Sequence, residues 1–136
     1  MTRRSFLNPI LGGQPELFQL RNETTGAIVA DRVLTAFDSS SRRTGLLKHR
    51  GLPDGTALIM APTNAIHTFF MRFAIDVVFV ARDGRVVKTR PTLGPWRMAA
   101  ALRAHAVVEL AAGALATSTT SPGDRLVVVA RPIAAS

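Results

Sequence analysis

Three polar side chains interrupt runs of apolar residues that have the composition of β-strands. His67 lies in AIHTFF, Asp76 in AIDVVFV and Glu109 in VVELAAG. Because apolar residues flank Asp76 on both sides, we expect both faces of its strand to be buried, and the carboxylate with them. A buried carboxylate needs either a cation or several N–H donors, because an unpaired charge in the interior strongly destabilises the fold.

Arginine is the expected partner of Asp76, because a guanidinium supplies both a positive charge and a bidentate pair of donors. A tryptophan beside an arginine in the segment GPWR could form an aromatic wall next to such a cluster. The candidate site residues, gathered from these runs and from the basic residues near them, are Arg43, His67, Arg72, Asp76, Trp96, Arg97 and Glu109.

These residues support three interpretations, between which the sequence does not decide. The first is a buried ion-pair network that fixes strand register. The second is a binding site for a small anionic or polar ligand, with Arg72 and Arg97 as anchors, Trp96 as a stacking wall and His67 as a hydrogen-bond donor. The third is catalysis with His67 as a general base, oriented by Asp76 or Glu109.

The catalytic interpretation lacks a nucleophile, because the chain contains no G-x-S-x-G motif. The sequence also lacks a P-loop and a G-x-G-x-x-G pattern, so nothing indicates a nucleotide cofactor. We therefore favour a non-enzymatic binding or accessory module. The alternative is a small-molecule hydrolase or isomerase that uses His67 and Asp76.

The amino-acid composition excludes several kinds of functional site. The absence of cysteine removes disulfides, thiolate metal sites and cysteine nucleophiles, and the three histidines show no i, i+4 pairing, so we expect no metal and no cofactor.

The net charge of +8 favours an anionic partner, but the arginines are spread along the chain and form no tract. A nucleic-acid module would also show exposed aromatic residues among the basic ones. We therefore do not expect nucleic-acid binding, and association of the arginines with nucleic acid or an anionic surface ranks last.

The length of 136 residues fits one domain, which we place at residues 15–132, after a flexible arm at 1–14 and before a tail at 133–136. No window has the ~18 uninterrupted apolar residues of a transmembrane helix. The apolar part of the N-terminal segment is too short for a secretion signal. We therefore expect a cytoplasmic protein.

Short β-prone runs separated by turn residues dominate the chain. A short helix is expected over 39–50 and a second over 98–104, while Asp83-Gly84 predicts a two-residue type I′ hairpin. The predicted strands are 17–21, 27–37, 57–61, 66–70, 75–81, 85–90, 106–110 and 125–130. The predicted fold is α+β and predominantly antiparallel, a partly closed, barrel-like sheet with one or two short helices.

Seven motifs in a fixed order resemble the family known as domain of unknown function 192. They are RRTGLL, GLPDGTALIM, IHTFFMRFAIDVVFV, DGRVV, PWR, VVELAAG and GDRL, between residues 35 and 128. The resemblance implies a compact, mostly antiparallel β domain with a short helix after the second strand. It implies no activity, although the occurrence of relatives beside pilus-assembly and secretion genes points to an accessory role. A site shared by the family would lie among the motif residues, which include all seven candidates named above.

Overall fold

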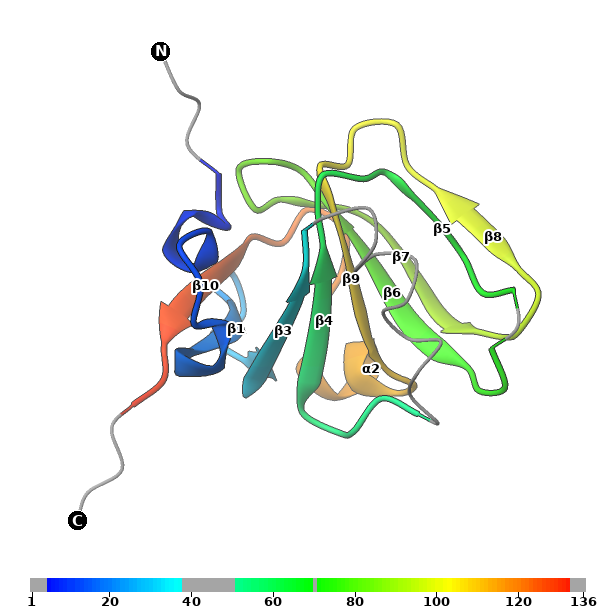
Figure 1. The fold of residues 1–136 in the computed structure, drawn as a ribbon, viewed down its shortest axis with the longest axis horizontal. Coiled ribbons are helices and arrows are strands. Elements are labelled where there is room, and N and C mark those ends of the chain that lie inside the picture. The colour runs from blue at the N-terminus through cyan, green and yellow to red at the C-terminus, as the bar shows by residue number, and fades with distance from the viewer. Residues whose placement is uncertain (1–4, 38–50, 70, 133–136) are drawn as a thin grey trace.

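The computed structural model describes residues 5–37, 51–69 and 71–132. Short strands follow one another with few helical turns between them (Figure 1). The elements are η1 (Asn8–Ile10), η2 (Pro15–Leu17), β1 (Phe18–Asn22), β2 (Ile28–Ala30), β3 (Arg32–Ala36), β4 (Thr56–Met60), β5 (Ala65–His67), β6 (Ile75–Val80), β7 (Val86–Leu93), β8 (Met98–Ala100), β9 (Ala106–Ala111), α2 (Ala114–Ser118) and β10 (Leu126–Ala130).

The described strands form three sheets. A five-stranded sheet has the order β3-β4-β9-β6-β7, a three-stranded sheet has the order β10-β1-β2, and β5 pairs with β8 in a two-stranded ribbon. All described pairs of strands are antiparallel except β3 and β4, which run parallel. The ribbon and the three-stranded sheet lie at opposite ends of the molecule in Figure 1.

Side chains on the two faces of the five-stranded sheet enter two different hydrophobic cores. The first core lies between this sheet and the three-stranded sheet, and Val78 and Val108 meet Leu20 and Leu126 there. The second core lies under the ribbon. It brings together Val77, Phe79, Val107, Leu58, Ile66 of β5 and Ala99 of β8. Every residue of β6 is buried, as expected for a strand with apolar residues at both alternating positions.

The predicted β-rich α+β class is confirmed, with one short α-helix in the described part of the chain. An isolated bridge between Arg85 and Arg125 links the start of β7 to the start of β10. The ladders between described strands do not continue into a closed barrel. The finer expectation of a barrel-like sheet therefore stays a prediction.

Several local predictions differ from the structure. The strand expected over 27–37 is two strands, because the chain bends at Asp31 and passes from the three-stranded to the five-stranded sheet. The helix expected over 98–104 is instead the strand β8, since its alanines pair with β5 and bury Ala99 in the second core. This pairing overrides the helical propensity of alanine. The helix expected over 39–50 lies outside the described residues.

The hairpin between β6 and β7 and the N-terminal arm also differ from the predictions. Residues 81–85 connect β6 and β7, and the N–H of Ala81 donates to the carbonyl of Arg85, so three residues lie between this pair. Among those three only Gly84 has a positive φ, so the turn is not type I′. In the N-terminal arm, for which the sequence predicts flexibility, Leu7 and Ile10 are buried in the first core.

Candidate functional site

Asp76 is held by backbone amides from two other parts of the chain. Its Oδ1 accepts a hydrogen bond from the N–H of Thr92 at 2.8 Å. Its Oδ2 accepts from the N–H of Gly113 at 3.1 Å and of Leu115 at 2.9 Å. Only 1% of the residue is exposed. Within the described residues no guanidinium pairs with this carboxylate, so the predicted arginine partner is replaced by three N–H donors.

Local backbone geometry explains why those donors are available. Gly113 precedes α2 with a φ of 98° and offers no capping side chain, so the carboxylate of Asp76 caps the first turn of the helix from a neighbouring strand. Thr92 has a φ of 49° at an irregularity in the β6–β7 pairing. Asp76 thus joins β6, the bulged end of β7 and the start of α2.

Glu109 has a different environment. It lies opposite Leu58 on β4 and Val77 on β6, whose side chains belong to the second core, whereas Asp76 faces the first core beside Leu115. Glu109 is 3% exposed, and its buried Oε2 has no hydrogen-bond partner among the described residues. Burial raises the pKa of Glu109 to about 8, so the carboxyl is mostly protonated at neutral pH. The two acids therefore do not form one cluster.

His67 points away from both buried acids, on the outer face of the ribbon. In β5 and β8 the middle residues Ile66 and Ala99 are buried in the second core, while His67 and Met98 are exposed directly opposite each other. The His67 ring lies 4.7 Å from the Phe69 ring, centroid to centroid. The Phe69 ring stacks on Trp96 at 5.7 Å. Three rings from two segments therefore form one aromatic cluster at the surface, with His67 and Trp96 exposed and Phe69 half-buried between them.

Thr68 fixes the loop that carries Trp96. The Thr68 hydroxyl donates to the carbonyl of Gly94 at 2.6 Å and accepts from the N–H of Arg97 at 2.8 Å. Its backbone N–H donates to the Arg97 carbonyl at 2.8 Å, and its carbonyl accepts from the N–H of Trp96 at 3.0 Å. Trp96 has a φ of 61°, an uncommon conformation for a large side chain, and the Thr68 contacts hold it there.

The predicted site residues therefore divide into two groups. His67, Arg72, Trp96 and Arg97 are exposed, with Arg72 just after the turn that Thr68 closes with Met71. Asp76 and Glu109 are buried on opposite faces of the sheet, and Arg43 lies outside the described residues. Sequence reasoning missed Thr68, Phe69 and Met98. Phe69 sits in a strand-like run that suggests burial, and Met98 begins the segment expected to be a helix. Only the isolated hydroxyl of Thr68 in an apolar run signals a special contact.

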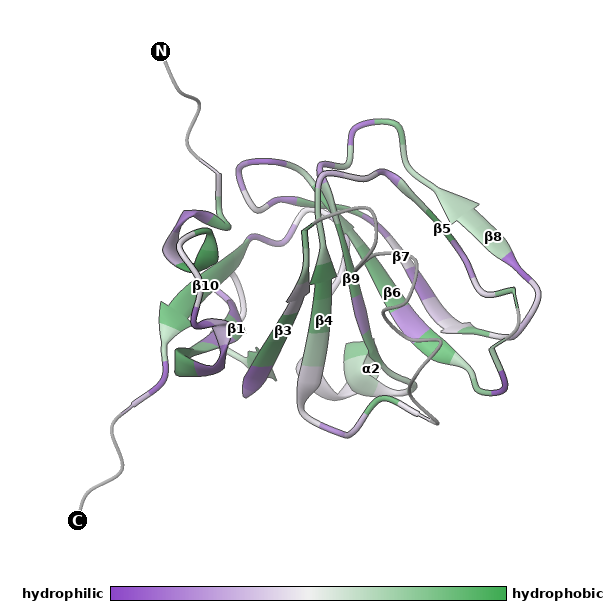
Figure 2. Ribbon diagram, in the orientation of Figure 1, coloured by the Kyte–Doolittle hydropathy of each residue, from purple (hydrophilic) through white to green (hydrophobic). Residues whose placement is uncertain are grey.

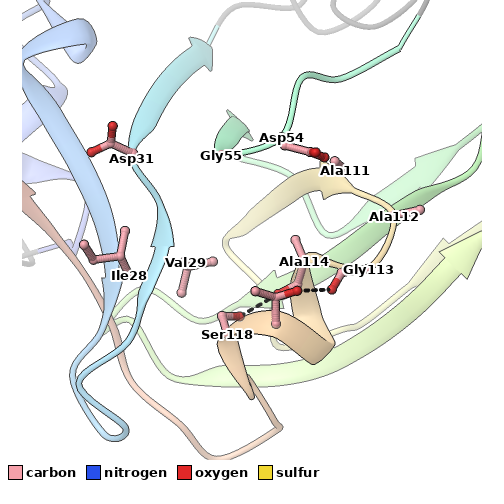
Figure 3. Close-up of a pocket in the computed structure, with 11 residues that line it drawn as sticks. Ile28, Val29, Asp31, Asp54, Gly55, Ala111, Ala112, Gly113, Ala114 and Ser118 are labelled. Carbon is pink, nitrogen blue, oxygen red and sulfur yellow. Dashed lines mark hydrogen bonds between the residues drawn. The ribbon is translucent and has the colours of Figure 1, made fainter.

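A pocket lies next to α2, on the face of the five-stranded sheet that is opposite to the ribbon. It has a volume of about 420 Å³, and Asp31 and Asp54 lie on its rim (Figure 3). Asp31 already pairs with Arg131 at 3.3 Å, and the hydroxyls of Thr117 and Ser118 donate to carbonyls of the same helical turn. The polar groups of this pocket are thus mostly engaged within the fold.

Across residues 5–37, 51–69 and 71–132, no three His, Asp or Glu side chains come together in a way that could hold a metal ion. No helix in the same ranges has the length and apolar character needed to cross a bilayer.

Comparison with known proteins shows the family and the fold. No curated protein matches the sequence. A structure described as a putative transcription regulator from Sinorhizobium meliloti 1021 is 23% identical with a TM-score of 0.70, and the match covers 80% of this chain and 89% of that chain. A protein of unknown function from Novosphingobium aromaticivorans DSM 12444 is 22% identical with a TM-score of 0.66, over 80% of this chain and 81% of the other. The model of DUF192, described as "Uncharacterized ACR", matches residues 20–128, most of the sequence. The chain therefore belongs to the DUF192 family.

Proposed function

We propose that this domain is a non-enzymatic binding module for an anionic ligand with apolar parts, and that the ligand binds the outer face of the ribbon. We call this face the ribbon surface. It consists of His67, Phe69, Trp96 and Met98. The exposed Arg97 follows Trp96 directly in the chain, and the exposed Arg72 follows Phe69 by three positions. The observation that carries the proposal is the cluster of the His67, Phe69 and Trp96 rings at the surface, in which Trp96 lies on a loop that Thr68 holds in one conformation. Binding surfaces gain affinity when their contact groups are ordered before the ligand arrives.

The charge distribution supports an anionic ligand. Residues 55–75 and 84–108, which supply both strands of the ribbon and all of β7, contain no aspartate or glutamate. The same two segments contain six cationic side chains, namely Arg72, Arg85, Lys88, Arg90, Arg97 and Arg103. An anion approaching the ribbon would therefore meet attraction without a competing carboxylate from these segments.

The alternative of a hydrolase or isomerase receives no support from the described geometry. A His–Asp pair acts in catalysis when the carboxylate orients the imidazole through a hydrogen bond. Both carboxylate oxygens of Asp76 accept hydrogen bonds from backbone amides beside the first core, whereas His67 is exposed above the second core. The five-stranded sheet separates the two side chains.

An anionic aromatic dye tests the proposal. Trp96 is the single tryptophan and the chain has no tyrosine, so energy transfer from tryptophan to 1-anilinonaphthalene-8-sulfonate reports a dye bound near the ribbon surface. We expect saturable transfer by the folded wild type, with Kd raised about three- to tenfold in Met98→Ser and in Arg97→Ala.

Leu17→Ser is the matched control, because Leu17 is a 53% exposed leucine outside the ribbon, next to the three-stranded sheet. We expect it to bind the dye as the wild type does. Absence of transfer in the wild type, or equal Kd values for the wild type, Met98→Ser and Arg97→Ala, would overturn the proposed function.

A further inference from the structure

The segment from Trp96 to Leu102 exposes apolar side chains at alternating positions. Trp96 is 57% exposed, Met98 68% and Leu102 93%. Ala100, between the last two, is exposed as well, and only Ala99 of β8 is buried. Figure 2 shows β8 in the pale green of hydrophobic residues, although it lies at the edge of the molecule. A soluble strand normally turns such side chains inward, so this outward stripe indicates a surface that is covered in use.

Cationic side chains occur in the same segment. Arg97 and Arg103 are both exposed, at the start and at the end of the apolar stripe. The stripe thus combines tryptophan, methionine and leucine with arginine. Tryptophan is enriched where a bilayer meets water, and arginine binds the phosphates of anionic lipids there.

We infer that the stripe from Trp96 to Leu102, together with Arg97 and Arg103, docks on the surface of an anionic lipid bilayer. This inference rests on the proposed function and names its ligand class. Leucine and methionine would enter the boundary between headgroups and acyl chains, and the two arginines would remain at the level of the phosphates.

Hydrogen bonds hold the stripe in a defined conformation. The N–H of Ala101 donates to the carbonyl of Asn64 at 2.9 Å, and the N–H of Ala104 donates to the carbonyl of Ala101 at 3.0 Å, so Leu102 sits at the tip of a closed turn. Lys88 Nζ donates to the carbonyl of Ala100 at 2.8 Å and ties β8 to β7. Docking would therefore order few additional groups.

Two other occupants fit the stripe less well. Bases of a single-stranded nucleic acid stack on planar side chains, which Met98 and Leu102 do not provide. A second copy of the chain, related by a twofold axis, would bring the cationic segments of both copies to the same interface, without a carboxylate from residues 84–108 to pair with them. Charge complementarity therefore favours an anionic surface with an apolar interior.

Vesicles test the inference directly. With vesicles of phosphatidylglycerol and phosphatidylcholine, we expect cosedimentation of the protein and a blue shift of Trp96 emission, both weakened by salt, and little of either with phosphatidylcholine alone. Leu102→Ser should weaken partitioning about tenfold, while Leu17→Ser should leave it unchanged. Because Leu102 is almost fully exposed, its replacement should not alter folding, which the thermal melt checks.

The outcomes separate this inference from the proposed function. If the dye binds as described but the anionic vesicles do not, the lipid inference fails and the proposed function stands. If neither binds, both fail. Tighter binding of a single-stranded oligonucleotide than of anionic vesicles, with loss in Arg97→Ala, would overturn the inference in favour of nucleic acid. Sedimentation of the free protein as a dimer that Leu102→Ser dissociates would overturn it in favour of self-association.

Discussion

Asp76 and Glu109 point to opposite faces of the five-stranded sheet, although they lie on paired strands. Asp76 is opposite Leu110 and faces the first core, while Glu109 is opposite Val77 and faces the second. Asp76 has three N–H partners, whereas Glu109 Oε2 has none among the described residues. The two carboxyl groups therefore differ in what they contribute to stability, and neither belongs to the ribbon surface.

Replacement of Asp76 should weaken the fold without touching the ribbon surface. In Asp76→Ala three backbone N–H groups lose their acceptor, and we expect a loss of about 3–5 kcal/mol in the free energy of unfolding. Asp76→Asn keeps one carbonyl oxygen and should lose less. Urea unfolding followed by circular dichroism measures both. A free energy of unfolding of Asp76→Ala equal to that of the wild type would show that the three hydrogen bonds do not form.

Glu109 should make stability fall as the pH rises. Its pKa is about 8 in the folded state against 4.5 for the ordinary side chain, so between these values the native state binds more protons than the unfolded state. The contribution of Glu109 to the free energy of unfolding is thus most favourable below pH 4.5, and it is lost progressively as the pH rises to about 8.

Glu109→Gln isolates this effect, because glutamine cannot ionise. The two proteins should have similar stability near pH 4, and the variant should be more stable at pH 9 by roughly 3–5 kcal/mol. Chemical denaturation at several pH values measures the difference. A stability difference that does not change with pH would mean that Glu109 ionises as it does in water.

Thr68 should control the ribbon surface through the loop of Trp96. Thr68→Val keeps the shape of the side chain but removes the hydroxyl that joins Gly94 to Arg97, and we expect a loss of about 1–3 kcal/mol in stability. Dye binding should weaken as well, because Trp96 is no longer held. Thr117→Val, whose hydroxyl donates to the carbonyl of Gly113 at the start of α2, is the control for dye binding. Retention of wild-type affinity in Thr68→Val would contradict the role given to this loop.

The sequence predicts the sheet well because its signals are local. The apolar run around Asp76 correctly predicts a strand buried on both faces, and the hairpin after it occurs where Asp83 and Gly84 predict it. The segment 98–104 is predicted wrongly, because its alanines pair with a strand more than 30 positions earlier in the chain. Pairing at that distance leaves no trace in local propensity.

The candidate site is only partly predictable for the same reason. Alternation along each strand predicts which residues share a face, but not which face covers which core. His67 and Asp76 therefore look like neighbours in the sequence, although the sheet separates them. Backbone N–H groups carry no side-chain signature, so the three donors to Asp76 could not be distinguished beforehand from a guanidinium.

The central claim is that ligands bind the ribbon surface and not a site at Asp76. Its most direct test is the dye affinity of Asp76→Asn and Met98→Ser, measured side by side under conditions where both are folded. We expect Asp76→Asn to bind 1-anilinonaphthalene-8-sulfonate with the wild-type Kd and Met98→Ser to bind it several-fold more weakly. Weakened binding by Asp76→Asn together with unchanged binding by Met98→Ser would contradict the claim.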